Sequence, residues 1–270
     1  MYIYHDSLLA KTAKIQISPL APGFMHGYGV FETIKVLDTC PVFLPEHLQR
    51  LQAGVAALGM HLADSLESIS ARCCELAAAN SIKRGYLKII CFLDEQGKTE
   101  TIIHTGIRFY DQEYEVGFRL GLTDVRRNET SRLCQIKSLN YAENIIEQRA
   151  ATARGFDEVL FLNTADHVCE GCRANIFWIK DGRVFTPALS CGILPGIIRR
   201  KIIDLCFSLN VPVSEGSFGL VELRCADEIF LTSSLLEIMP VSLFETRPMA
   251  FGPNTVASHL SAVFKNKQGR

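Results

Sequence analysis

Residues 137–199 decide the fold, and they read KSLNYAENIIEQRAATARGFDEVLFLNTADHVCEGCRANIFWIKDGRVFTPALSCGILPGIIR. A helical pattern runs from about Tyr141 to Arg154, and a second one runs from Ile197 to Leu209. Apolar segments of strand character lie between the two, at Asp157 to Asn163 and at Ala174 to Lys180. This mixture of helices and strands predicts an α/β lobe in the second half of the chain.

The first half of the chain predicts a separate lobe of the same kind. Its strands form two expected hairpins, 30–36 with 40–44 and 85–93 with 101–109. One helix begins at Pro45, and another begins near Ser65, a residue type that caps helix N-termini. The polar segment from Tyr110 to Glu115 is expected to link the lobes. We therefore predict a two-lobed α+β fold, with a smaller domain over residues 1–112 and a larger one over residues 113–270.

The composition of the chain limits the classes of function. Of its 270 residues, 48% are hydrophobic, which is enough for a buried core in each lobe. A net charge of −1 gives no overall field that would attract nucleic acid or an anionic membrane. The N-terminus lacks a signal-peptide pattern, and no apolar run approaches the roughly 18 residues of a membrane span. Ten irregularly spaced cysteines fit a reducing compartment, so we expect a cytoplasmic protein.

Two residues in the deciding stretch are candidates for covalent and acid–base chemistry. Lys137 is expected at the end of a short strand, directly before a helix. A lysine amine can bond to an aldehyde, although most lysines are simply solvated. Glu170 lies at the junction of two apolar strands, where a carboxylate usually faces water. Such a carboxylate can instead keep a pyridine nitrogen protonated, which makes the ring an electron sink.

Other segments can bind an anion. Pro195-Gly196 precedes the helix that begins at Ile197, and the first amides of a helix suit a phosphate. Thr232-Ser233-Ser234 ends a strand with three hydroxyl groups, which are also common in turns. Arg50 lies on the first helix, away from its apolar face, where a solvent-facing position is the ordinary expectation. Together with the lysine and the carboxylate, the helix start and the hydroxyls fit pyridoxal phosphate, although each feature also has an ordinary structural explanation.

Two other motifs favour different chemistry only weakly. Cys169-x-x-Cys172 suits a metal or a redox pair, but zinc needs about four ligands and no second pair of this kind lies nearby. Gly27-Tyr28-Gly29 lacks the third glycine and the strand–helix setting of a dinucleotide-binding loop. We therefore expect neither a metal nor a dinucleotide.

Seven segments occur in an informative order: His26-Gly27-Tyr28-Gly29-Val30-Phe31-Glu32-Thr33, His47-Leu48-Gln49-Arg50-Leu51, Lys137-Ser138-Leu139-Asn140-Tyr141, Glu170-Gly171, Asn175-Ile176-Phe177, Gly192-Ile193-Leu194-Pro195-Gly196-Ile197 and Glu237-Ile238-Met239-Pro240-Val241. With them the chain resembles, over nearly its whole length, the fold-type IV pyridoxal-phosphate enzymes. These include branched-chain aminotransferases, D-amino-acid aminotransferases and aminodeoxychorismate lyases. The resemblance implies a site in the cleft between the lobes, and a homodimer in which the partner subunit helps to cover each site.

The resemblance also implies a role for each candidate residue. Lys137 would form an imine with the cofactor aldehyde and later move the substrate proton. Glu170 would pair with the pyridine nitrogen, and Tyr141 would lie near the phenolic oxygen of the ring. The phosphate would be bound by Arg50, Ile197, Ile198, Ser233 and Ser234.

The reaction depends on how the substrate carboxylate is held. Lys88 is the only cation on the strand 86–93, and both this lysine and the chain length are similar to the aminodeoxychorismate lyases. Cys91-Phe92-Leu93 replaces the Thr-Arg-Gly usual in those lyases. Three further positions depart from the family pattern: Tyr28, Ala174 and Ile198. We expect a lyase that releases pyruvate and 4-aminobenzoate, a folate precursor. The alternatives are an aminotransferase of branched-chain or D-amino acids, and a binding protein that has kept the fold.

Overall fold

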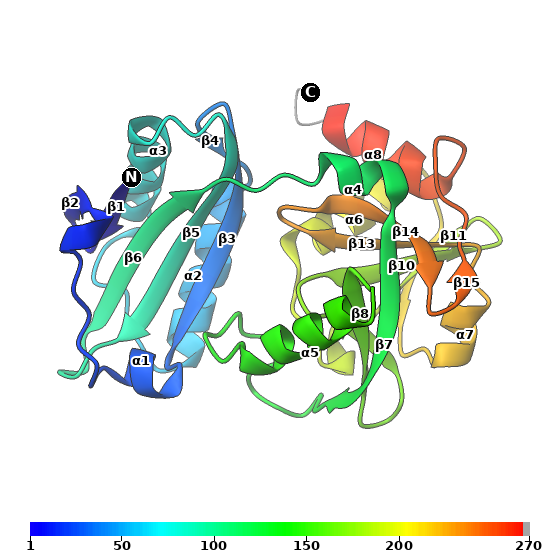
Figure 1. Cartoon of the computed structure of the whole chain (residues 1–270), viewed down its shortest axis with the longest axis horizontal. Helices are drawn as coiled ribbons and strands as arrows, with labels where there is room; N and C mark the ends of the chain where they lie inside the picture. The colour runs from blue at the N-terminus through cyan, green and yellow to red at the C-terminus, as the bar shows by residue number, and fades with distance from the viewer. Residues whose placement is uncertain (267–270) are drawn as a thin grey trace. The chain divides into compact units, whose positions relative to one another are not determined.

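The computed structural model describes residues 1–266, which form two compact units (Figure 1). The first unit consists of Met1–Phe109 and Ile136–Tyr141, and the second consists of Tyr110–Gln135 and the residues from Ala142 onward. The domain boundary that we expect after residue 112 stays a prediction. Nothing in the sequence pattern predicts the return of Ile136–Tyr141 to the first unit, and this return makes Lys137 part of that unit.

The first unit is built on a six-stranded antiparallel sheet. In spatial order its strands are β2 (Leu8–Lys11), β1 (Tyr2–His5), β6 (Thr99–Gly106), β5 (Arg84–Leu93), β3 (Gly29–Leu37) and β4 (Cys40–Pro41). Its helices are α1 (Pro22–His26), α2 (Leu44–Ala57) and α3 (Leu66–Ala79), with a short 3-10 helix at Thr12–Lys14. Both expected hairpins are present, but their second strands end early, at Pro41 and at Gly106.

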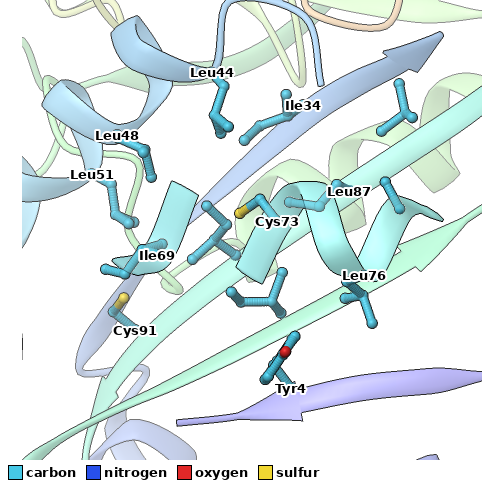
Figure 2. Close-up of a cluster of buried hydrophobic side chains, with 14 of the residues drawn as sticks. Tyr4, Ile34, Leu44, Leu48, Leu51, Ile69, Cys73, Leu76, Leu87 and Cys91 are labelled. Atoms are coloured by element: carbon cyan, nitrogen blue, oxygen red, sulfur yellow. The ribbon is translucent and has the colours of Figure 1, made fainter. Parts of the chain in front are cut away.

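The core of the first unit joins one face of this sheet to α2 and α3. The cluster includes Val30, Ile34 and Val36 of β3, Leu87, Ile89 and Cys91 of β5, Leu48 and Leu51 of α2, and Ile69, Cys73 and Leu76 of α3 (Figure 2). Successive side chains of a strand point to opposite faces, so Phe31 and Lys88 lie on the other face of the sheet. The helix α3 begins at its expected cap, where the Ser65 hydroxyl accepts a hydrogen bond of 3.2 Å from the Ser68 amide.

The second unit is built on a nine-stranded mixed sheet. In spatial order its strands are β12 (Val213–Gly216), β11 (Arg183–Pro187), β10 (Asn175–Lys180), β13 (Glu228–Ser233), β14 (Glu237–Phe244), β7 (Phe118–Arg127), β8 (Glu158–Asn163) and β9 (Val168–Gly171), while β15 (Arg247–Pro248) pairs with β14. An additional pairing of β9 with β10 closes six of these strands into a ring. Its helices are α4 (Asp111–Val116), α5 (Ala142–Ala153), α6 (Ile197–Ser208), α7 (Leu220–Arg224) and α8 (Val256–Asn266), with a 3-10 helix at Leu189–Cys191.

Three expectations about local structure were wrong. The segment from Tyr110 to Glu115 is no plain link, because most of it forms α4, whose first turn carries Asp111 and Glu113 where acidic side chains are favourable. Lys137 follows a turn rather than a strand. Glu170 lies within the short strand β9 rather than in a turn between strands.

Candidate active site

The backbone around Lys137 is fixed against β3 of the first unit. The Lys137 carbonyl accepts a hydrogen bond of 2.9 Å from the Phe31 amide, and the Leu139 amide donates one of 2.9 Å to the Gly29 carbonyl. An isolated β-bridge between Val30 and Ser138 lies between these two bonds. The lysine is therefore held at the edge of a sheet, on a rigid element, although no regular strand precedes it.

Two lysines share one aromatic ring on the face of this sheet opposite α2 and α3. The Lys137 Nζ lies 4.4 Å from the centroid of the Phe31 ring, and the Lys88 Nζ lies 4.7 Å from it. Tyr141 meets Phe31 edge-on at 5.3 Å and lies 5.6 Å from the Lys137 nitrogen. Cation–π contacts of this kind stabilise the ammonium form of an amine. The structure thus brings Lys137 and Tyr141 together, with Phe31 as an aromatic wall that the sequence motifs contained without a role.

Lys88 is half-buried, and burial lowers its pKa below the ordinary lysine value. Its neighbour across the sheet is His104 of β6, whose pKa is also lowered, chiefly by burial. Within the first unit, no carboxylate forms an ion pair with Lys88. A half-buried ammonium group without an anionic neighbour is a natural binding point for a carboxylate.

Arg50 does not face solvent as its position on the helix suggested. Its side chain is only 14% exposed, and its Nε and Nη2 each donate a hydrogen bond of 2.7 Å to the Glu32 carboxylate. Glu32 also accepts a hydrogen bond of 2.6 Å from Nδ1 of His47, which lies one turn before Arg50 on α2. The sequence carried a signal for this cluster: a glutamate in the inward register of β3, and a His-x-x-Arg spacing that puts both side chains on one helix face.

Glu170 is anchored within the second unit by two N–H donors. Its Oε2 accepts hydrogen bonds from the Asn175 side-chain amide at 2.9 Å and from the Leu194 backbone amide at 3.1 Å. Asn175 also donates to the Leu194 carbonyl at 3.0 Å, so the asparagine orients both partners. A carboxylate held as an acceptor by two donors is suited to stay ionised beside a protonated ring nitrogen. Asn175 entered the sequence motifs without a stated role.

The start of α6 offers an anion-binding geometry next to this carboxylate. Gly196 caps the helix without a side-chain hydrogen bond, and the first amides of a helix, here those of Ile197 and Ile198, have no partner inside the helix. A Cβ at Gly196 would lie 1.9 Å from the Asn175 Oδ1. The start of α6 is therefore packed so closely against Asn175, the residue that binds Glu170, that only glycine fits at position 196.

Pyridoxal phosphate fits these residues. Thr232, which pairs with Asn175 across β13 and β10, has a buried hydroxyl that finds no hydrogen-bond partner within residues 1–266. The half-buried Ser233 and Ser234 follow it, and the Ser233 hydroxyl accepts a hydrogen bond of 3.2 Å from the Leu236 amide. An orphan hydroxyl, a glycine cradle and an anchored carboxylate are the groups that a phosphate and a basic ring require. Lys137, Arg50 and Tyr141 belong to the first unit, and the other five candidate residues belong to the second.

The cysteines beside Glu170 are buried thiols. The Cys169 Sγ donates to the Cys191 carbonyl at 2.9 Å, and burial raises the pKa of both Cys169 and Cys172. A thiol whose pKa is raised is a poor nucleophile and a poor metal ligand. No cluster of three or more metal-ligating side chains occurs between residues 1 and 266.

Comparisons with known proteins show the family to which the chain is similar. Residues 29–244 match the family model described as amino-transferase class IV. The chain is 29% identical over 275 residues to the aminodeoxychorismate lyase of Bacillus subtilis (strain 168), covering 98% of this chain and 94% of that protein. It is 31% identical over 244 residues to a D-alanine aminotransferase of Listeria innocua serovar 6a, covering 85% and 83%. The crystal structure of a branched-chain aminotransferase from Thermoproteus uzoniensis superposes with a TM-score of 0.91 at 26% identity, covering 98% and 94%. Lyases and aminotransferases are therefore matched about equally well.

None of the helices between residues 1 and 266 combines the length and the apolar character that crossing a bilayer requires.

Proposed function

Because the chain belongs to the amino-transferase class IV family, whose enzymes depend on pyridoxal phosphate, we propose that it is a 4-amino-4-deoxychorismate lyase. In this reaction the substrate loses pyruvate and becomes 4-aminobenzoate, a precursor of folate. The chain has the fold-type IV architecture. Its relatives include both lyases and aminotransferases.

The observation that carries the choice of a lyase is the position of Lys88. The substrate has its amine and its ring carboxylate at opposite ends of one six-membered ring. Lys137 would receive the amine end, and Lys88, whose nitrogen contacts the same Phe31 ring, would take the carboxylate. Its ammonium group lacks an anionic partner within the first unit, which supports this assignment.

Different residues of the chain would bind different parts of the cofactor. Arg50, the amides of Ile197 and Ile198, and the hydroxyls of Ser233 and Ser234 would hold the phosphate of the cofactor. Glu170 would hold the proton on the ring nitrogen, and Tyr141 would donate to the phenolic oxygen. When bound, the cofactor supplies the electron sink.

Lys137 is the proposed base. Its amine would take the proton from the substrate carbon that bears the nitrogen, and the Phe31 face would stabilise the resulting ammonium. Loss of the enolpyruvyl group then leaves an aromatic ring. The departing enolate takes up a proton to become pyruvate, so the atoms balance without a further reactant.

The decisive experiment mixes cofactor-loaded protein with aminodeoxychorismate and measures 4-aminobenzoate and pyruvate together. We expect equal amounts of both products and a loss of at least a thousandfold in Lys137→Ala. Lys83→Ala removes an exposed lysine and serves as the matched control, with unchanged turnover. A yellow, borohydride-sensitive protein that forms neither product would reject the lyase.

An aminotransferase of branched-chain or D-amino acids is the second candidate, favoured by the similarity to the Listeria D-alanine aminotransferase. It would transfer the amino group of an amino acid to a keto acid, and amino-acid panels of both hands would detect it. A colourless protein that takes up no cofactor would instead indicate a binding protein. We also propose a cytoplasmic homodimer whose partner subunit helps to cover each site, and sedimentation of the loaded protein tests its mass.

A further inference from the structure

A buried arginine lies in the first turn of α6, in the second unit. Arg199 is the third residue of this helix and is only 4% exposed. Its Nη2 donates a hydrogen bond of 2.6 Å to the Pro187 carbonyl and another of 2.5 Å to the Glu215 carboxylate. Burying a guanidinium group is costly unless it is paired and hydrogen-bonded, and these two oxygens provide both kinds of contact.

The charges of this turn run against the usual preference of a helix. The positive end of the helix dipole lies at the N-terminus, where acidic side chains are favourable and cations are not. The first turn of α6 carries no acidic residue, and it contains both Arg199 and Arg200. The exposed Arg200 pairs with Asp204, one turn further along, at 3.0 Å. Helix stability therefore does not explain a buried arginine at position 199.

Arg199 closes the loop that precedes its own helix. Pro187 is the last residue of β11, and residues 188–196 lead from it to the start of α6. The bond from Arg199 to the Pro187 carbonyl joins the two ends of this loop. Glu215 lies on β12, directly opposite Thr186 of β11, so the two acceptors belong to neighbouring strands. The arginine therefore ties the start of α6 to the β11–β12 end of the nine-stranded sheet.

The closed loop carries one of the two donors that hold Glu170. The Leu194 amide, within the loop, donates to the Glu170 carboxylate, and the Asn175 side chain is the second donor. Asn175 lies on β10, outside the loop. Glu170 would therefore keep one of its two donors if the loop shifted.

The first amides of α6 depend on Arg199 more directly. A Cβ at Gly196 would lie 3.2 Å from the Arg199 Cβ, so the arginine stem packs beside the glycine that begins the helix. The amides of Ile197 and Ile198 belong to the same turn as Arg199 and move with it. Loss of the contacts of Arg199 would consequently displace these amides.

We propose that Arg199 is a positioning residue, which holds the start of α6 in the geometry that the phosphate of the cofactor requires. This inference rests on the assignment of the Ile197 and Ile198 amides to the phosphate in the proposed function. Arg199 touches neither substrate nor cofactor in this role and acts through the backbone of the helix start. A displaced helix start aims the two amides poorly at the phosphate and spares the contacts of the pyridine ring.

The test compares two ligands that differ only in the phosphate. Apoprotein of Arg199→Gln is titrated with pyridoxal phosphate and with pyridoxal, beside the unsubstituted protein. We expect the dissociation constant for pyridoxal phosphate to rise about tenfold and that for pyridoxal to stay unchanged. Glu215→Ala removes the carboxylate and leaves the bond to the Pro187 carbonyl. It should show the same selective loss to a smaller degree, and it serves if Arg199→Gln does not fold.

Arg72→Gln is the matched control for Arg199→Gln. Arg72 is also a buried arginine on a helix, and it likewise joins a backbone carbonyl, that of Asp6, to a carboxylate, that of Asp64. This variant should lower thermal stability and leave the ratio of the two affinities unchanged.

Two results would overturn the inference. Equal weakening of both ligands by Arg199→Gln would make Arg199 merely structural, and unchanged binding of both would make the helix start independent of it. A failure of the proposed function has a different outcome, because unsubstituted protein that binds pyridoxal as tightly as pyridoxal phosphate would reject the phosphate assignment itself and the inference with it. Neither titration contains substrate, so an absence of lyase activity would leave the comparison intact.

Discussion

A lysine on a half-buried sheet face can keep its charge only if something nearby stabilises it. For Lys88 the stabilising group is the Phe31 ring, and burial still lowers its pKa. A bound carboxylate would provide the missing counter-charge and raise that pKa again. The affinity for a carboxylate substrate must then depend on whether Lys88 is protonated before binding.

This dependence has a definite sign. The pKa of Lys88 is lowered from 10.5, so the ammonium is lost at a lower pH than for an exposed lysine. We expect the KM for aminodeoxychorismate to rise on the alkaline side, beginning below pH 10.5. Lys88→Arg should move this rise to higher pH, because an arginine stays charged. Lys88→Met should raise KM about tenfold at neutral pH and remove the rise, with kcat changed much less.

Lys35→Met is the matched control for the Lys88 series, since Lys35 lies on the same face of the sheet, on β3. An alkaline rise in KM that survives in Lys88→Met would assign the titration to another group, and Lys88 would lose its role as the carboxylate partner.

Elements with local signals are predictable from the sequence, and elements held by distant partners are not. The cap at Ser65 and the hairpin of β5 and β6 were predicted because the capping residue adjoins its helix and the two apolar strands flank the turn signal Asp94–Gly97. β9 is only four residues long, and it exists because β8 and β10 pair with it. Lys137 is placed by hydrogen bonds to β3, more than a hundred positions earlier in the chain.

The residues of the candidate site also fall into those that local sequence motifs indicate and those whose roles depend on distant partners. Lys137, Glu170 and Arg50 were given roles from the sequence motifs, whereas the residues that orient the last two stood in the same motifs without a role. Glu32 anchors Arg50 and Asn175 anchors Glu170, and both contacts arise from strand register and helix packing. A helical wheel placed Arg50 in solvent because it contained no information about a charged residue on the facing strand.

The start of α6 is the element whose geometry is most restrictive. Gly196→Ala would place a Cβ 1.9 Å from the Asn175 Oδ1, so either the helix start or the asparagine must move. Because Asn175 holds Glu170, we expect both weaker binding of pyridoxal phosphate and a loss of turnover, each by at least tenfold. Titration of apoprotein and the product assay measure the two effects.

Gly219→Ala is the control for Gly196→Ala, because Gly219 also caps a helix and has an ordinary negative φ. A Cβ there meets only the flexible Glu222 side chain, at 3.2 Å. This variant should bind the cofactor normally. Normal binding and turnover in Gly196→Ala would show that the packing of α6 against Asn175 is unimportant.

At the scale of the whole molecule, the reactivity of the ten cysteines shows which parts of the fold exclude solvent. Three are exposed, namely Cys40, Cys74 and Cys225, and Cys134 is half-buried. The six buried ones are Cys73, Cys91, Cys169, Cys172, Cys191 and Cys206. Cys169 lies on β9, the strand that closes the ring of the second unit, and Cys172 directly follows that strand. Their protection therefore depends on the pairing of β9 with β8 and β10.

A thiol-reactive reagent applied to the native protein should separate these groups by rate. We expect Cys40, Cys74 and Cys225 to react quickly, Cys134 more slowly, and the six buried thiols only on unfolding, because burial both excludes the reagent and raises the pKa of groups such as Cys73 and Cys169. Mass spectrometry of the labelled peptides assigns each rate. Fast labelling of Cys169 or Cys172 would mean that β9 opens in the native state, and a strand that opens could not hold Glu170 as a fixed partner for a ring nitrogen. If Cys169 and Cys172 are labelled slowly, and equally slowly with and without cofactor, β9 is already paired with β8 and β10 before the cofactor binds. Glu170 is then positioned in advance.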